Sequence, residues 1–176
     1  MSFTKIILGV GLSTAIAGTF AHAQEGAGFS EGDRIFTLSG GGSSDHDFDS
    51  TTASIQLGLG QFLNDYVAAG VRQDLSVADL TDSNDWNAST RLGIDFYPAT
   101  GRAAPYIGAN IGYIYGDVVR DQFIAGPNVG IRYFINDTTF LTLGVEYQFL
   151  FKDRDEAQDA YKDGRFVYEL GMGVKW

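Results

Sequence analysis

The sequence predicts an all-β protein, an eight-stranded antiparallel up-and-down transmembrane β-barrel. Three observations predict this fold class: apolar residues recur at every second position in eight segments, the connections are alternately short and long, and glycines share one strand face with the charged residues. A period of two is the signature of a strand with one apolar face. An even number of such strands, with tight turns at one end and longer loops at the other, is typical of a closed barrel.

The last segment shows the alternation most clearly. Apolar residues stand at every second position from Phe166 to Trp176, and the positions between them carry Arg165, Glu169, Lys175 and two glycines. In chain order the eight strands are expected at residues 33–41, 52–61, 65–77, 86–97, 104–115, 123–134, 139–151 and 164–176.

Each of the other strands is justified by its own alternating residues. They are Phe36 in the first; Ala53, Ile55, Leu57 and Leu59 in the second; Val67, Ala69, Val71, Leu75 and Val77 in the third; Trp86, Ala88, Leu92, Ile94 and Phe96 in the fourth; Ile107, Ala109, Ile111, Tyr113 and Tyr115 in the fifth; Phe123, Ala125, Val129, Ile131 and Tyr133 in the sixth; and Leu141, Leu143, Val145, Tyr147 and Phe149 in the seventh. No charge is expected on this face.

The connections support the same plan. The longer ones are acidic and read GSSDHDFDS, DLTDSND, GDVVRD and DRDEAQDAYKD, whereas QFLND, PATGR and IND are mostly tighter. Pro127 lies inside the sixth strand, and because proline cannot donate to a ladder it predicts a bulge or a locally broken pair there.

The chain divides into three parts. Residues 1–23 carry Lys5, an uncharged apolar stretch and Ala21-His22-Ala23, which predicts a cleaved secretory signal peptide. Residues 24–32 are expected to form a short periplasmic lead-in, and residues 33–176 the outer-membrane barrel. An uncleaved membrane anchor is the alternative for the first part, but the apolar run is shorter than the ~20 residues that a helical span needs.

Composition excludes some partners. The chain has 22 acidic and 12 basic residues, a formal net charge of -10 and no cysteine. A nucleic-acid partner is therefore not expected, because such a surface cannot neutralise a row of phosphates. Without cysteine after the signal, neither disulfides nor a lipoprotein anchor is expected.

Alternation alone does not say which face lies inside, since a soluble ligand carrier would turn its apolar face inward. Glycines on a solvent-exposed strand face weaken it, whereas inside a narrow barrel they make room for long charged side chains. Aromatic residues also gather near both strand ends of the apolar face, as two membrane interfaces select. The apolar face is therefore expected to contact lipid, with Trp176 at the periplasmic boundary.

These residues resemble a known family. The terminal aromatic Trp176 and a Gly-x-Asn-x-Gly motif used twice, at Gly108–Gly112 and Gly126–Gly130, are similar to the small bacterial outer-membrane barrels of the OmpA transmembrane domain and OmpX type. The resemblance covers residues 33–176 and implies a barrel in the bacterial outer membrane. It specifies architecture and not activity, because such barrels host adhesins, enzymes, pores and anchors. A periplasmic wall-binding domain like that of OmpA is not expected after the barrel, so anchoring to the wall is not implied.

A charge network is expected inside the barrel. The inward face carries Arg72, Arg91, Glu146, Glu169, Asp95, Arg132 and Lys175. Extrapolated hairpin registers place Arg72 opposite Arg91 and Glu146 opposite Glu169, on facing walls of the lumen. Two arginines would then face two glutamates and close the lumen. The same residues would also suit an ion-selecting constriction, or charges that are each solvated by trapped water.

Neither a catalytic site nor a dedicated metal site is expected. His46 is the single histidine after the signal, and Ser43, Ser44, Asp45 and Asp47 are neighbours in sequence, which does not make a catalytic triad. The spacing of Asp45, Asp47 and Asp49 resembles a calcium loop, but Ser50 and Gln56 occupy the positions of its Gly and Glu. No catalytic residue, metal site or cofactor is therefore assigned.

The sequence thus indicates a non-enzymatic outer-membrane protein with a structural or surface-interaction role, expected to be monomeric. A narrow pore for small solutes or ions is the alternative, and a lipid-modifying enzyme is a weaker one. The expected partners are outer-membrane lipid and lipopolysaccharide. Divalent cations could bridge the lipopolysaccharide to the acidic loops, which carry Asp45, Asp47, Asp49, Asp79, Asp82, Asp85, Asp153, Asp155, Glu156 and Asp159.

Overall fold

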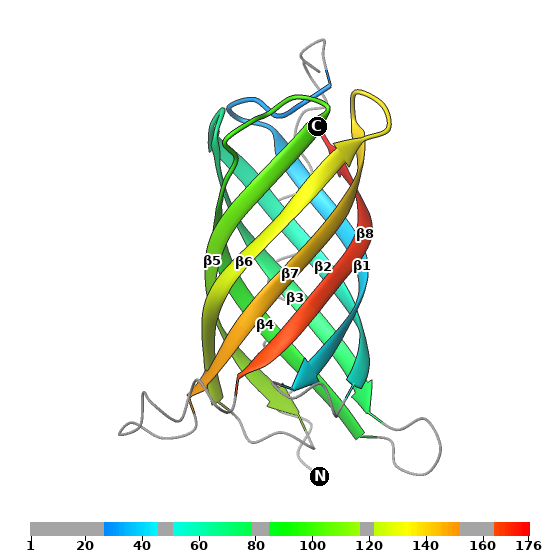
Figure 1. Cartoon of the computed structure of the whole chain (residues 1–176), viewed down its shortest axis with the longest axis vertical. Coiled ribbons are helices and arrows are strands. Elements are labelled where there is room, and N and C mark those ends of the chain that lie inside the picture. Colours follow the sequence, from blue (N-terminus) through cyan, green and yellow to red (C-terminus); the bar gives the residue numbers. More distant parts are fainter. Residues whose placement is uncertain (1–26, 46–50, 79–84, 117–121, 152–163) are drawn as a thin grey trace.

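The computed structural model describes residues 27–45, 51–78, 85–116, 122–151 and 164–176. Their eight strands are β1 (Arg34–Asp45), β2 (Thr51–Asn64), β3 (Val67–Ala78), β4 (Asp85–Phe96), β5 (Ala103–Gly116), β6 (Gln122–Phe134), β7 (Thr139–Phe151) and β8 (Arg165–Lys175). Each strand pairs antiparallel with the next, and β8 pairs with β1, which closes the barrel (Figure 1). The expected fold class is confirmed.

The strand positions agree with the alternation, and most of their ends lie within a few residues of those expected. Two strands extend further than expected. β1 continues to Asp45, toward the longer connections, and β2 continues past Gln61 to Asn64, toward the tight turns. Within the described ranges no helix is long and apolar enough to cross a membrane.

Three tight connections lie at one end of the barrel, where the chain also ends (Figure 1). In the β2–β3 turn the Tyr66 amide donates to Asn64 Oδ1 at 2.8 Å. In the β6–β7 turn Asn136 Oδ1 accepts from the amides of Thr138 and Thr139 at 3.0 and 2.8 Å. Short side chains that bond to nearby backbone amides favour such turns. This end is called the tight-turn end below.

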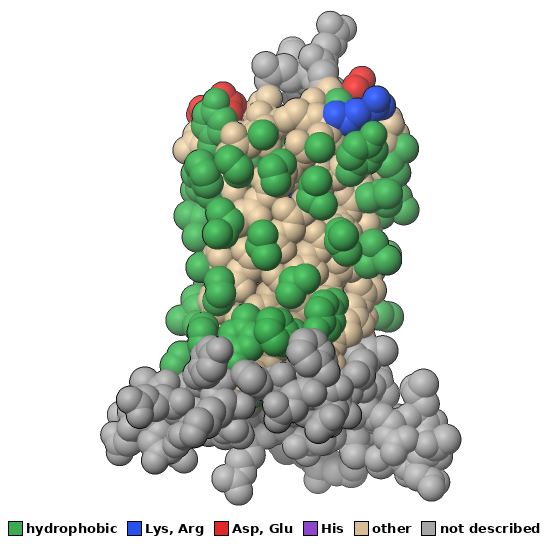
Figure 2. Space-filling view, in the orientation of Figure 1, with side chains coloured by type: hydrophobic (Ala, Val, Ile, Leu, Met, Phe, Trp, Pro, Cys, Tyr) green, Lys and Arg blue, Asp and Glu red, His purple; other side chains and the backbone are tan. Residues whose placement is uncertain are grey.

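The outward face of the barrel wall is apolar. Leu143 lies between Ile131 of β6 and Leu170 of β8, and the exposed fractions of the three are 57%, 39% and 66%. Figure 2 shows hydrophobic side chains over the visible wall, with charged side chains gathered at the tight-turn end. A wall of this kind cannot be left in water, since exposed apolar surface of this extent marks contact with lipid or another apolar partner.

One charged residue departs from the expected pattern. Arg34 is exposed and alternates with the inward-facing Ile35, so it belongs to the outward face at its tight-turn edge. The expectation of a charge-free outward face is therefore wrong at that edge. The cause is positional, because Arg34 opens β1 next to the turns, where the membrane interface accepts a long cationic side chain.

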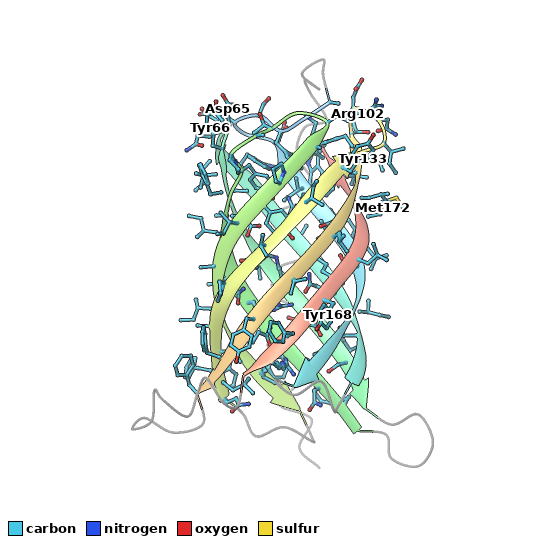
Figure 3. All side chains as sticks on the ribbon, viewed as in Figure 1. Asp65, Tyr66, Arg102, Tyr133, Tyr168 and Met172 are labelled. Atoms are coloured by element: carbon cyan, nitrogen blue, oxygen red, sulfur yellow. The ribbon has the colours of Figure 1, made fainter. Side chains whose placement is uncertain are left out.

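Aromatic rings form a belt toward the opposite end of the wall. The ring of Tyr147 lies 5.1 Å from Phe149 and 4.9 Å from Phe166, and the rings of Tyr113 and Phe123 lie 5.0 Å apart. These edge-to-face contacts join β5 to β6 and β7 to β8. Figure 3 shows Tyr168 near this end, with Tyr66 and Tyr133 at the tight-turn end.

Pro127 interrupts the ladder on one side only. The β6–β7 pairing runs from Phe123 to Ala125, skips Gly126 and Pro127, and resumes at Asn128 in the same register. The pairing of Pro127 with Ala109 of β5 is kept. Of the two expected outcomes, the structure therefore has the locally broken pair and no bulge.

Candidate functional site: the barrel lumen

The lumen is filled by side chains in three layers. The layer nearest the tight turns is an aromatic cluster that the sequence reasoning did not anticipate. Its buried members are Phe29, Ile35, Phe62, Ala68, Tyr97, Ala104, Tyr106, Phe134 and Phe140. For the members that lie on strands the inward direction follows from alternation, because Phe62 and Tyr106 have the same parity as the neighbouring inward glycines. The signal was therefore present in the sequence.

The lead-in segment supplies the centre of this cluster. Phe29 stacks on Phe62 at 4.5 Å and meets Phe134 and Phe140 edge-on at 4.8 and 5.3 Å. The Phe29 amide donates to the carbonyl of Thr100 at 3.2 Å, which ties the segment to the β4–β5 turn.

Gly28 turns the chain inward just before Phe29. Its φ is +139°, in a region that residues with a Cβ rarely adopt, and a Cβ there would collide with the Thr100 carbonyl. At the other end of the segment Lys175 Nζ donates to Asp33 Oδ2 at 3.0 Å. The segment therefore enters the tight-turn mouth of the barrel and is held there at both ends.

Arg132 links the aromatic cluster to the charged layers. Its guanidinium lies 5.7 Å from the Phe29 ring centroid, 5.4 Å from those of Tyr97 and Tyr106, and 5.3 Å from that of Phe140. Desolvated cation–π contacts of this kind stabilise a buried cation. Burial raises the pKa of the Tyr97 phenol well above its usual range, so this ring stays neutral beside the guanidinium.

The second layer is organised around Asp95. Arg72 donates to Asp95 Oδ2 at 2.5 Å, Asn128 donates to Oδ1 at 2.8 Å, and Arg132 lies 3.8 Å from Oδ2. Asn128 belongs to one Gly-x-Asn-x-Gly motif and pairs across strands with Gly108 of the other. The two motifs thus lie side by side on paired strands, and the second places the Asn128 amide where it stabilises the buried Asp95 carboxylate by a hydrogen bond.

Two glycines make room for the Tyr106 side chain between these layers. Tyr106 pairs with Gly130, which in turn pairs with Gly144 of β7. A Cβ at either glycine would overlap the Tyr106 hydroxyl. These two glycines therefore allow the Tyr106 ring to lie against the inner wall over β6 and β7.

The third layer is centred on a buried ion pair that spans the lumen. Arg91 of β4 donates to Glu146 Oε2 of β7 at 2.5 Å, and the side chains are 1% and 8% exposed. Arg91 also donates to Gln56 Oε1, and its Nη2 lies 3.4 Å from Asp74 Oδ2. Gln148 donates to the second oxygen of Glu146 at 2.5 Å. Both charges are paired and hydrogen-bonded, which burial of charge requires.

The pairing expected for the two glutamates is wrong. In the β7–β8 ladder Glu146 lies opposite Val167 and Glu169 lies opposite Gly144, a register two residues away from the expected one. Glu169 accepts a hydrogen bond from Ser39 Oγ at 2.8 Å. The expected register was extrapolated from the ends of a long loop, and alternation fixes only its parity.

The two arginines do lie opposite each other in the β3–β4 ladder. Their repulsion is relieved separately, because Arg72 pairs with Asp95 of the adjacent strand and Arg91 with Glu146 across the barrel. Among the described residues the Arg91–Glu146 pair crosses the lumen as expected, whereas Arg72 does not bond to Glu169.

Little space remains between the layers. One cavity of about 10 Å³ lies among Arg72, Arg91, Tyr106 and Glu146, and another of about 20 Å³ lies beside Arg72, Asp95 and Arg132. A water molecule needs roughly 10–15 Å³ of such space. Several buried polar atoms beside these cavities lack a protein partner, including Arg72 Nη1 and Asn128 Oδ1. A single water molecule would fit each cavity and could hydrogen-bond to these polar atoms.

No family model and no curated protein matches this chain. Solved structures do match. The outer membrane protein OprG from Pseudomonas aeruginosa is 16% identical with a TM-score of 0.62, over 86% of this chain and 99% of that one. The N-terminal β-barrel domain of OprF from the same organism is 14% identical with a TM-score of 0.63, over 84% and 100%. Neisserial surface protein A is 15% identical with a TM-score of 0.60, over 84% and 97%.

The chain has the fold of the small outer-membrane β-barrels. This fold accounts for the positions of the residues singled out from the sequence. The strands bring Arg72, Arg91, Asp95, Arg132 and Glu146 into the lumen, whereas Lys175 lies at its tight-turn mouth with Asp33.

Other residues singled out from the sequence lie elsewhere. Trp176 follows β8 and exchanges two backbone hydrogen bonds with Arg34, at 3.0 and 3.1 Å. His46 and most of the acidic loop residues lie outside the described residues, as does the expected signal peptide. In the part of the chain that the structure describes, no group of three or more His, Asp or Glu side chains is placed to hold a metal ion.

The lead-in should contribute to the stability of this outer-membrane barrel fold. We expect Phe29→Ala to lower the free energy of unfolding by about 3 kcal/mol, because it leaves a cavity among packed rings. Urea unfolding in phospholipid vesicles measures the change. Phe96→Ala is the control, since Phe96 is 48% exposed on the outward face and its loss leaves no cavity inside the protein. Equal losses in both variants would contradict the packing role of Phe29.

Proposed function

We propose that this protein is a closed, non-enzymatic barrel of the bacterial outer membrane with a structural or surface-interaction role. The observation that carries the proposal is the packed lumen of the described residues, in which an aromatic cluster and the Arg91–Glu146 pair surround cavities of about 10 and 20 Å³. A hydrated ion needs a continuous path, and these spaces each fit about one water molecule.

The outer-membrane location is supported by two independent features. The outward face of the described wall is apolar, with an aromatic belt toward one end, as lipid contact requires. The similar solved structures are an outer membrane protein, a β-barrel domain and a surface protein. Both features favour a membrane barrel, and its longer connections would face outward from the cell, as in other outer-membrane barrels.

Surface interaction is the more specific part of the proposal. In this orientation the four longer connections would be the parts available to other molecules, and they are rich in Asp and Glu. We propose lipopolysaccharide as their neighbour, bridged by divalent cations because both surfaces are anionic. The protein would act as a monomer, since a closed barrel leaves no strand edge unpaired.

Planar-bilayer recording tests the proposal against the narrow pore. We expect the purified protein to insert without steady conductance steps, because its lumen is occupied along three layers. The variant with Arg91→Ala and Glu146→Ala is the matched comparison, and it should also stay closed, since the aromatic cluster and the Asp95 layer still fill the lumen. Steady single-channel steps in the unaltered protein would contradict the closed barrel and support the pore.

A further inference from the structure

A groove lies on the outside of the barrel. It measures about 370 Å³ and lies across β1, β2 and β3 near the tight-turn end. Leu59 pairs with Val71 along one part of it, and Gln61 pairs with Ala69 along the next. Ala69 has only a methyl group where its neighbours have longer side chains, and the floor beside it is formed by the paired Gly60 and Gly70. The wall is therefore hollowed rather than ridged at this place.

The groove is apolar along the wall and cationic at its tight-turn end. Leu59, Ala69 and Val71 line the apolar part, whereas Arg34 and Trp176 stand together at the end, with Gln61 of β2 opposite Arg34. Among the described residues the exposed Arg34 side chain has no hydrogen-bond or ion-pair partner. An unpaired cation next to an aromatic ring at the edge of an apolar wall has the chemistry that binds a lipid phosphate.

Two carboxylates lie beyond Arg34 toward the tight turns. The chain preceding Arg34 runs beside the end of β2, where the Phe62 amide donates to the Asp33 carbonyl and the Gly32 amide donates to the Phe62 carbonyl. The Glu31 amide donates to Asp65 Oδ1 at 2.9 Å, which places Glu31 beside the β2–β3 turn. Both residues are exposed. Moving away from the wall along this edge, the order of charges is therefore a cation followed by anions. Asp33 is not available for this purpose, since it accepts from Lys175 and from the Ser30 amide.

We propose that the groove binds a phospholipid with a phosphoethanolamine headgroup. One acyl chain lies over Ala69 between the larger apolar side chains. The phosphate lies at Arg34, and the ammonium one ethylene unit further out lies at Glu31 and Asp65. The order of charges favours this headgroup over an anionic one, which would bring negative charge to the two carboxylates. The inference rests on the proposed lipid contact of the outward face.

Quenching of Trp176 fluorescence tests the site, because this residue lines the groove. The chain has two tryptophans, so the Trp86→Phe variant leaves Trp176 as the single reporter. The full barrel is inserted into phosphatidylcholine bilayers that contain a small fixed fraction of one lipid with brominated acyl chains. That lipid is phosphatidylethanolamine, phosphatidylglycerol or phosphatidylcholine. We expect brominated phosphatidylethanolamine to be enriched at Trp176 about threefold to fivefold over phosphatidylglycerol, the effect of one or two exposed charge pairs. Phosphatidylcholine should lie between the two, because its ammonium follows the phosphate in the same order but has no N–H to donate to the carboxylates.

Two variants should abolish the enrichment for different reasons. Arg34→Gln removes the charge that holds the phosphate, and Ala69→Leu fills the groove. The controls are Arg102→Gln, an exposed cation in the β4–β5 turn, and Ala109→Leu, an exposed outward alanine on β5. Both controls should keep the full enrichment.

A third variant tests the headgroup. Glu31→Gln combined with Asp65→Asn removes both carboxylates while keeping Arg34, and should shift the preference from phosphatidylethanolamine to phosphatidylglycerol. A preference of the unaltered barrel for phosphatidylglycerol would overturn the proposal, as would equal quenching by all three lipids, or chemical cross-linking of two copies through the groove. Quenching by none of the lipids would overturn the lipid contact of this face as well, which separates the two failures.

Discussion

Replacing Arg91 with methionine should lower the free energy of unfolding by about 3–5 kcal/mol, the usual effect of removing one partner of a buried ion pair. The guanidinium is 1% exposed and bonds to Glu146 and Gln56, with Asp74 nearby. Without it, Glu146 stays buried with Gln148 as its remaining donor. Urea unfolding in phospholipid vesicles, followed by tryptophan fluorescence, measures the loss.

A double-mutant cycle separates the pair from its surroundings. Arg91→Met combined with Glu146→Leu removes both charges and replaces them with apolar side chains of similar length. We expect this double variant to be more stable than Arg91→Met alone, because no uncompensated charge remains at that position. Arg102→Met, an exposed turn residue, should change stability by at most about 0.5 kcal/mol. If Arg91→Met were as well tolerated as Arg102→Met, the lumen charges would be solvated and not paired.

Arginine in place of Leu143 should cost about 2–4 kcal/mol, the range measured for cationic side chains on the lipid face near the bilayer midplane. Leu143 is 57% exposed, yet its neighbours Ile131 and Leu170 are apolar and also exposed. In a soluble protein an exposed leucine would accept this change with little effect. The large expected cost comes from lipid as the surrounding solvent.

Ile135→Arg is the matched control for this prediction. Ile135 is 50% exposed but lies in the β6–β7 turn, where a long cationic side chain reaches water. Its variant should lose about 0–1 kcal/mol. Equal tolerance at Leu143 and Ile135, measured by urea unfolding in the same vesicles, would mean that the outward face does not contact lipid.

The sequence predicted which face of each strand points into the lumen, and this identified most of the side chains that line it. Because side chains alternate across a strand, inward glycines and charges identify the face that lines the lumen. The same rule applied to Phe62 and Tyr106 identifies the aromatic cluster. Phe29 could not be found in this way, since it precedes the first strand and reaches the lumen through the turn at Gly28.

The sequence by itself determined the number of strands, their order and the face that each side chain occupies, because these follow from local alternation and turn chemistry. The tertiary structure decided which charges meet. Glu146 bonds to Arg91 on a strand three positions away around the barrel, and Glu169 to Ser39 across the closing β1–β8 pair. Such partners depend on the register of every ladder and on closure of the ring. A shift of two residues keeps every face unchanged but exchanges every partner, and only packing of the complete lumen distinguishes one such register from another.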